Sequence, residues 1–137
     1  MDEPDGCRVL IDDNDLKIYV IKASWIVVVQ VMSWKRETVD KWIAFIRASN
    51  DKLRSPVRIL YDLREAGPPS QYFLDVLGPV IRELNLPDDI RSAYVFNTGP
   101  YARFASSFMR RTPTGAGQIK DFTDWDEAID WLTATDV

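Results

Sequence analysis

The chain has 137 residues, a length that fits one domain and allows roughly two thirds of the unfolded surface to be buried. Its composition, 46% hydrophobic and 28% charged, indicates neither disorder nor a membrane protein, and its net charge of −4 argues against capture of nucleic acid over the whole surface. It contains no histidine and one cysteine, Cys7, which excludes His-based triads, His general bases, the usual zinc sites and an internal disulfide.

The amino-terminal residues 1–15 begin with the acidic "MDEPDG", which has neither a basic segment nor an apolar core of a signal peptide. The longest apolar run, residues 25–29, is far short of the roughly 20 residues that span a bilayer. We therefore expect a cytoplasmic protein without integral membrane contact. The stretch "RVLI" within residues 1–15 adds either a short strand or a frayed, flexible arm.

Two apolar runs rich in β-branched residues follow, "LKIYVI" and "WIVVVQVM", separated only by Lys22, Ala23 and Ser24. They predict an antiparallel hairpin with a tight turn. After Ser33, apolar residues recur at three- and four-residue intervals as far as Leu53, which predicts an amphipathic helix.

Strands and helices alternate through the rest of the chain. "VRILYDL" predicts a buried strand, and residues 70–84 predict a helix that is kinked or split at Gly78–Pro79. "SAYVF" predicts another strand, followed by a helix containing residues 104–109. "QIKDF" predicts the last strand, and "TDWDEAIDWL" the last helix, with Thr123 as its cap.

This order of elements predicts a single α/β domain over residues 1–137. The expected sheet has five strands, mixed, with the antiparallel hairpin at the amino-terminal side and the remainder mainly parallel, and about four helices flank it.

The stretch "RVLIDDND" has the pattern of a phosphoacceptor domain, in which a strand leads to paired aspartates. Here, however, the acidic pair leads into a hairpin rather than a helix, so Asp12 and Asp13 need not approach Asp62. Lys120 also lacks the proline that follows the corresponding lysine in receiver domains. We therefore predict a solvated turn at "DDND" and no phosphoryl chemistry at Asp62.

Three stretches together resemble a known family: "VRILYDLREAG", "SAYVFNTGPYARFASSFM" and "IKDFTDWDEAIDWL". The last is the most specific, with a strand ending in Phe, a capped turn and an acidic-Ala-x-x-Trp-Leu helix. Over roughly residues 16–134 the chain resembles the SpoIIAA-like branch of the STAS-like proteins, which are compact bacterial α/β domains. The resemblance implies a bacterial STAS-like fold that works through protein contacts.

Relatives that antagonise anti-sigma factors carry a phosphorylatable Ser at the head of the second helix, where Ser70 is the nearest hydroxyl in this chain. Ser70 is therefore either a switch residue or a plain helix cap.

The first functional hypothesis is a non-enzymatic regulatory or scaffold domain that binds proteins, most simply a second copy of itself, and needs no metal or cofactor. Five tryptophans favour it, because aromatic side chains are enriched at interfaces. Trp34, at a junction of strand and helix, is the best candidate for an exposed anchor.

The alternative is a small-molecule or lipid-binding site, enzymatic or not, at the carboxyl ends of the parallel strands, where open α/β sheets have their usual crevice. Four residues lie at such ends: Asp62, Arg64, Asn97 and Thr98. For Asn97 and Thr98, helix capping is the competing role.

Overall fold

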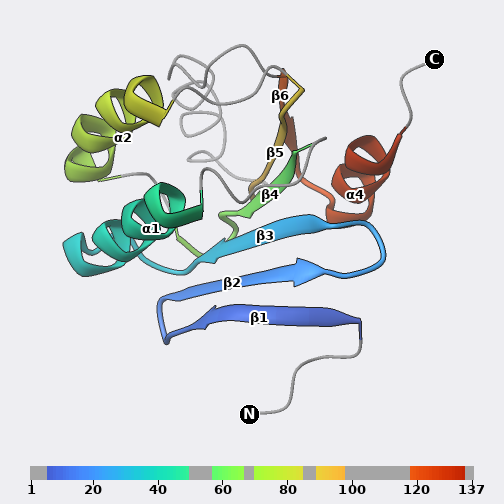
Figure 1. The fold of residues 1–137 in the computed structure, drawn as a ribbon, viewed down its shortest axis with the longest axis horizontal. Coiled ribbons are helices and arrows are strands. Elements are labelled where there is room, and N and C mark those ends of the chain that lie inside the picture. The colour runs from blue at the N-terminus through green and yellow to red at the C-terminus, as the bar shows by residue number, and fades with distance from the viewer. Residues whose placement is uncertain (1–5, 50–56, 67–69, 85–88, 98–117, 135–137) are drawn as a thin grey trace.

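The structure of the chain, a computed structural model, describes residues 6–49, 57–66, 70–84, 89–97 and 118–134. These residues form six strands and three helices, in the order β1-β2-β3-α1-β4-α2-β5-β6-α4 (Figure 1). The helix expected to contain residues 104–109 lies outside the described residues.

The first three strands form an antiparallel meander: β1 (Cys7–Asp12), β2 (Leu16–Ile21) and β3 (Ile26–Val31). More and less buried residues alternate along β1 and β2, whereas Val28 and Val29 of β3 are both buried. Residues 7–12 are thus a strand rather than a frayed arm, and the sheet has six strands instead of five. The register shifts between Val9 and Ile11, which marks a β-bulge in this edge strand.

The turn between β2 and β3 is one residue longer than the sequence suggested. Ile21 pairs with Ile26, so the turn contains residues 22–25 and includes Trp25. The backbone N–H groups of Ser24 and Trp25 both donate to the Ile21 carbonyl, and Trp25 adopts a positive φ of 58°. That conformation is uncommon for a bulky residue.

The remaining elements alternate as expected: α1 (Arg36–Ser49), β4 (Arg58–Asp62), α2 (Gln71–Leu84), β5 (Arg91–Val95), β6 (Gln118–Phe122) and α4 (Trp125–Thr133). Helix α2 is assigned continuously across Pro79 and is not split into two pieces. Helix α4 is capped by Asp124 rather than Thr123, because the Asp124 carboxylate accepts a hydrogen bond of 2.8 Å from the backbone N–H of Asp126.

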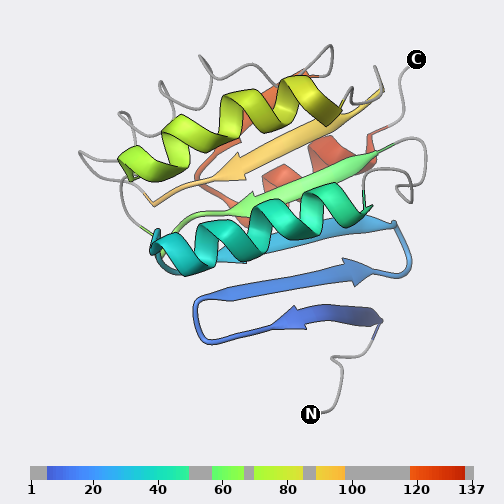
Figure 2. The same ribbon diagram turned by 60° about the vertical axis from the view of Figure 1, so that its left-hand side comes forward.

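All six strands lie in one sheet in sequence order, with β3, β4, β5 and β6 parallel. Helices α1 and α2 cover one face of this sheet, and α4 lies on the other (Figure 2). Since strand residues point alternately to the two faces, strands such as β3, β4 and β5 supply both cores.

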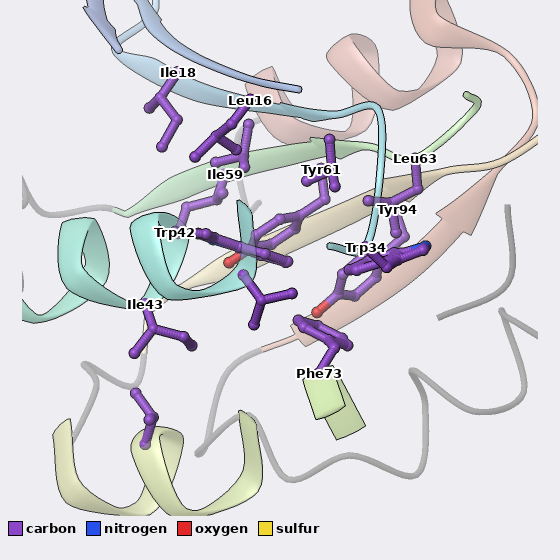
Figure 3. Close-up of a cluster of buried hydrophobic side chains, with 14 of the residues drawn as sticks. Leu16, Ile18, Trp34, Trp42, Ile43, Ile59, Tyr61, Leu63, Phe73 and Tyr94 are labelled. Carbon is purple, nitrogen blue, oxygen red and sulfur yellow. The ribbon is translucent and has the colours of Figure 1, made fainter. Parts of the chain in front are cut away.

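An aromatic core lies between the sheet and helices α1 and α2 (Figure 3). Trp34 belongs to this core and not to the surface. It is only 9% exposed, and its ring centroid is 4.5 Å from that of Phe73. Phe73 also stacks on Trp42 at 5.0 Å. The expectation of an exposed Trp34 anchor is therefore wrong, because the ring packs beneath α2, where Phe73 provides a large apolar contact.

Candidate functional site

Three side chains form a row across the sheet at the carboxyl end of the parallel strands. Lys17 of β2 lies opposite Gln30 of β3, and Gln30 pairs in register with Asp62 of β4. Val28 and Leu60, two residues earlier in β3 and β4, pack in the core beneath α4, so the row lies on the α4 face of the sheet.

This row belongs to a pocket of about 620 Å³. Helix α4 packs against β4, β5 and β6, and within the described ranges no helix covers β2 at this end of the sheet (Figure 2). Because β2 is antiparallel to β3, its first residues meet the last residues of the parallel strands here. Seven of the nine lining residues are polar, and they come from four separate segments: Asn14, Lys17, Gln30, Val31, Met32, Asp62, Arg64, Glu65 and Asn97.

Asp62, the last residue of β4, is the most enclosed charged group of the pocket, with its side chain 10% exposed. Its Oδ1 accepts from the backbone N–H and Nε of Arg64 at 3.3 and 2.9 Å, and its Oδ2 accepts from Arg64 Nη2 at 2.9 Å and Gln30 Nε2 at 3.2 Å. A carboxylate offers about four lone-pair sites. The acceptor capacity of Asp62 is therefore filled.

The protonation of Asp62 follows from these partners. Burial by itself raises the pKa of Asp62, but the hydrogen bonds and charge of Arg64, together with the Gln30 amide, lower it by more. The net pKa lies below its ordinary value, so the carboxylate is ionised at neutral pH. Since every lone pair is also engaged, Asp62 is poorly placed to act as a general base or nucleophile.

Arg64 is held in place from three sides. Its guanidinium forms a two-pronged bond with Asp62, and its backbone carbonyl accepts a hydrogen bond from Asn97 Nδ2. Its guanidinium carbon also lies 5.5 Å from the centroid of the Trp125 ring, at the start of α4. The fork uses Nε and Nη2, and within the described part of the chain Nη1 has no partner, so it can bond to a ligand.

Lys17 is the other cation of the pocket. No residue of the described ranges makes an ion pair or hydrogen bond with its ammonium group. Asp12 lies opposite Lys17 in the register of β1 and β2, yet no salt bridge joins them. An exposed, uncommitted ammonium therefore faces a pocket in which the other cation is already fixed.

The structure brings together three of the residues that the sequence singled out, since Asp62, Arg64 and Asn97 all line the pocket. Thr98 lies outside the described residues. Ser70 lies apart, immediately before α2, where its Oγ accepts a hydrogen bond of 3.2 Å from the Phe73 backbone N–H. This is the helix-cap contact that the sequence allowed for Ser70.

The sequence interpretation missed Lys17, Gln30, Asn14 and Glu65. One of them carried a readable signal: Gln30 is the single polar residue in the strand "IVVVQV". A polar side chain in an otherwise apolar strand calls for a hydrogen-bonding partner. Asp62 is that partner.

The acidic residues of the β1–β2 turn form ion pairs with lysines of helix α1 and of the segment just before it, and not with the Asp62 site. Asp13 forms an ion pair with Lys41 at 2.8 Å, and Asp15 with Lys35 at 3.5 Å. All four side chains are well exposed. Within the part of the chain that the structure describes, no group of three or more His, Cys, Asp or Glu could hold a metal ion.

Comparison with known proteins identifies the architecture. No family model and no curated protein matches the sequence. Among solved structures, the chain is similar to an uncharacterized protein of the DUF3478 family with a SpoIIAA-like fold from Shewanella loihica PV-4, with a TM-score of 0.59. The similarity covers 96% of this chain and 98% of the other. The chain has a SpoIIAA-like fold.

The resemblance that the sequence motifs suggested is thus confirmed for the fold. Sequence identity over the SpoIIAA-like fold is 15%, so the similarity extends to the architecture alone. None of the helices described is long and apolar enough to cross a membrane.

Proposed function

We propose that this protein is a small-molecule-binding domain whose site is the polar pocket at the carboxyl ends of β3, β4 and β5. The observation that carries the proposal is the fixed Arg64. Asp62, Asn97 and Trp125 hold it from three sides, and no residue that the structure describes bonds to its Nη1. A cation that is ordered before the ligand arrives loses little entropy on binding.

The size and position of the pocket support the same function. A volume of about 620 Å³ lies within the range of roughly 300–1,000 Å³ that is typical of small-ligand sites. Open α/β sheets bind ligands at the carboxyl ends of their strands. Here the junction between the antiparallel meander and the parallel strands provides the opening.

Binding without turnover fits the pocket better than catalysis. Asp62 has its lone pairs filled, and burial first, then the nearby Cys7 and Asp62, raise the pKa of the neighbouring Tyr19 to about 12. Neither group is suited to accept a proton at neutral pH. We infer a receptor-like role in which the pocket binds a ligand without converting it.

Native mass spectrometry of freshly purified protein tests this function, because it reports subunit number and any retained small molecule together. We expect a stoichiometric mass increment that disappears in Arg64→Ala. The matched control is Arg47→Ala, because Arg47 forms an exposed ion pair with Glu83 on the helices α1 and α2 and should leave the increment unchanged. An increment that survives Arg64→Ala, or protein that binds nothing from a metabolite library, would contradict the proposal.

A second candidate is a regulatory or scaffold domain that binds another protein, most simply a copy of itself. A specific feature favours it: Trp25, at the tip of the β2–β3 turn, is 44% exposed although its φ is positive. A bulky residue in that conformation costs stability where Gly or Asn would not. Retention of such a strained, exposed indole is typical of a contact residue.

Sedimentation at micromolar concentration tests this candidate with Trp25→Asn. Asn tolerates a positive φ, so the variant removes the indole without straining the turn. We expect a dimer that Trp25→Asn weakens while thermal stability is unchanged or slightly higher. A strictly monomeric parent would remove the self-association form of this hypothesis.

A further inference from the structure

The free donors of the pocket indicate what charge its ligand carries. Lys17 Nζ and Arg64 Nη1 both lack a partner among the described residues, whereas the acceptor sites of Asp62 are filled from within the protein. The backbones of β2 and β4 are about 10 Å apart, a gap that two long cationic side chains can bridge with one anionic group. Unused positive donors on both sides of a pocket favour an anion.

Two acceptors of the pocket are amide oxygens whose orientation is fixed by chemistry. Gln30 faces a carboxylate and Asn97 faces a backbone carbonyl, and both of these partners can only accept. Each amide must therefore present its NH₂ group to that partner. Gln30 Oε1 and Asn97 Oδ1 remain, and they suit a ligand that also carries hydroxyl groups.

Glu65 is the negative group that such a ligand would meet. It lines the pocket next to Arg64, but its side chain is exposed and its charge is screened by water. The charge of Asp62 is already balanced by Arg64. Glu65 therefore weakens the attraction for an anion without abolishing it, and its removal should tighten binding.

We propose, on the basis of the function proposed above, that the ligand is a small hydroxylated organic anion. Its carboxylate or phosphate group is held between Lys17 and Arg64, and its hydroxyl groups donate to Gln30 and Asn97. Carboxylate and phosphate both match the Arg64 donors, so the two are distinguished by experiment.

Nuclear magnetic resonance titrations with four probes on one carbon skeleton test this inference: glucose, glucosamine, gluconate and glucose 6-phosphate. The readouts are the Nε–H resonance of Arg64 and the side-chain amide of Gln30, both located in the pocket. We expect saturable shifts with gluconate or with glucose 6-phosphate, and none with the neutral or cationic sugar. The anion that binds more tightly shows whether the ligand carries a carboxylate or a phosphate group.

Four variants make the test specific. Lys17→Gln should raise the Kd of the binding anion by about tenfold, and Lys17→Arg should restore most of it. Lys120→Gln, the control, removes the same charge from β6, outside the pocket, and should leave the Kd unchanged. Glu65→Gln should lower the Kd.

Several outcomes would overturn the inference: equal shifts with glucose, preference for glucosamine, no saturable shift with either anion, or an unchanged Kd in Lys17→Gln. The proposed function fails by a different result. A neutral or cationic molecule retained in mass spectrometry and lost in Arg64→Ala would preserve the binding function and refute the anionic ligand. Protein that retains and binds nothing would refute both.

Discussion

Two pairs of cationic side chains lie at opposite ends of the same sheet face, and their hydrogen bonds differ. At the amino ends of β4 and β5, Arg58 donates to the carbonyls of Leu132, Val57 and Asp89. Arg91 beside it donates to the carbonyls of Trp131 and Ala134 at 3.1 and 2.9 Å. At the carboxyl ends, Arg64 and Lys17 keep donors that no described residue uses.

The difference separates structural from ligand-binding cations. Arg58 and Arg91 supply positive charge and donors to the carboxyl end of α4, where the last carbonyls have no partner within the helix. Their donors are used within the fold. The carboxyl-end pair instead faces a pocket, and the predictions below compare these two ends, from the largest expected effect to the smallest.

Removing residues 125–132 should disrupt the packing of α4 against the amino ends of β4 and β5. The deletion takes away one carbonyl acceptor each of Arg58 (Leu132) and Arg91 (Trp131), together with the apolar cover of the core beneath α4, which includes Ala128 and Leu132. We expect loss of cooperative unfolding by circular dichroism. A truncated chain that still melts sharply near the parent's temperature would show that α4 is peripheral.

Arg91→Met should destabilise the fold by about 1–3 kcal/mol, because it removes a buried guanidinium and leaves the part-buried carbonyls of Trp131 and Ala134 without this donor. Met keeps most of the volume. The control, Arg47→Met, breaks an exposed ion pair and should cost at most about 1 kcal/mol. Urea unfolding measures the loss of stability in both variants. Equal losses would contradict the distinction between buried structural arginines and exposed ones.

Asp62→Asn should cost about 1–2 kcal/mol at neutral pH, a discounted value because the Arg64 side chain is 38% exposed. The pKa of Asp62 is lowered on folding. Its contribution is therefore present above the unfolded pKa of about 4 and is lost as pH falls through the lower folded pKa.

The stability difference between parent and Asp62→Asn should accordingly shrink below about pH 4. Urea midpoints at neutral and acidic pH measure it. Asp13→Asn, which removes an exposed partner of Lys41, serves as the control. A difference that stays constant down to pH 2 would mean that the ionised carboxylate does not stabilise the fold.

Lys17→Gln should have the smallest effect on folding, within about 0.5 kcal/mol, because its ammonium group has no partner in the described structure. The same variant should nevertheless raise the Kd of the anion about tenfold. A loss of stability above about 1 kcal/mol would place Lys17 with the structural arginines.

The sequence predicted the parallel part of the fold well because its periodicity is strong. The short apolar run within "RILYD" is typical of a buried strand, and the apolar residues of α1 and α2 recur at the helical period. The same reasoning gave the wrong prediction for Trp34, which was expected to be exposed. Its burial depends on the nonlocal contact with Phe73, and no local pattern contains that information.

Some of the pocket residues could be predicted from the sequence, and others could not. The rule that polar residues follow parallel strands at one edge identified Asp62, Arg64 and Asn97. Lys17 and Gln30 required the strand register, which depends on the length of the β2–β3 turn. A three-residue turn would pair Lys17 with Val29, whereas the four-residue turn pairs it with Gln30. One residue decided which side chains face the pocket.

The β-bulge in β1 also affects how the chain behaves at high concentration. β1 is the outer strand of the sheet, and an edge of this kind can template further strands from other molecules. The shifted register between Val9 and Ile11 interrupts the regular spacing of hydrogen-bonding groups, and the exposed Arg8 and Asp12 place charges along the strand. We therefore expect the folded protein to resist fibre-like polymerisation through this edge, so that any assembly it forms stays finite.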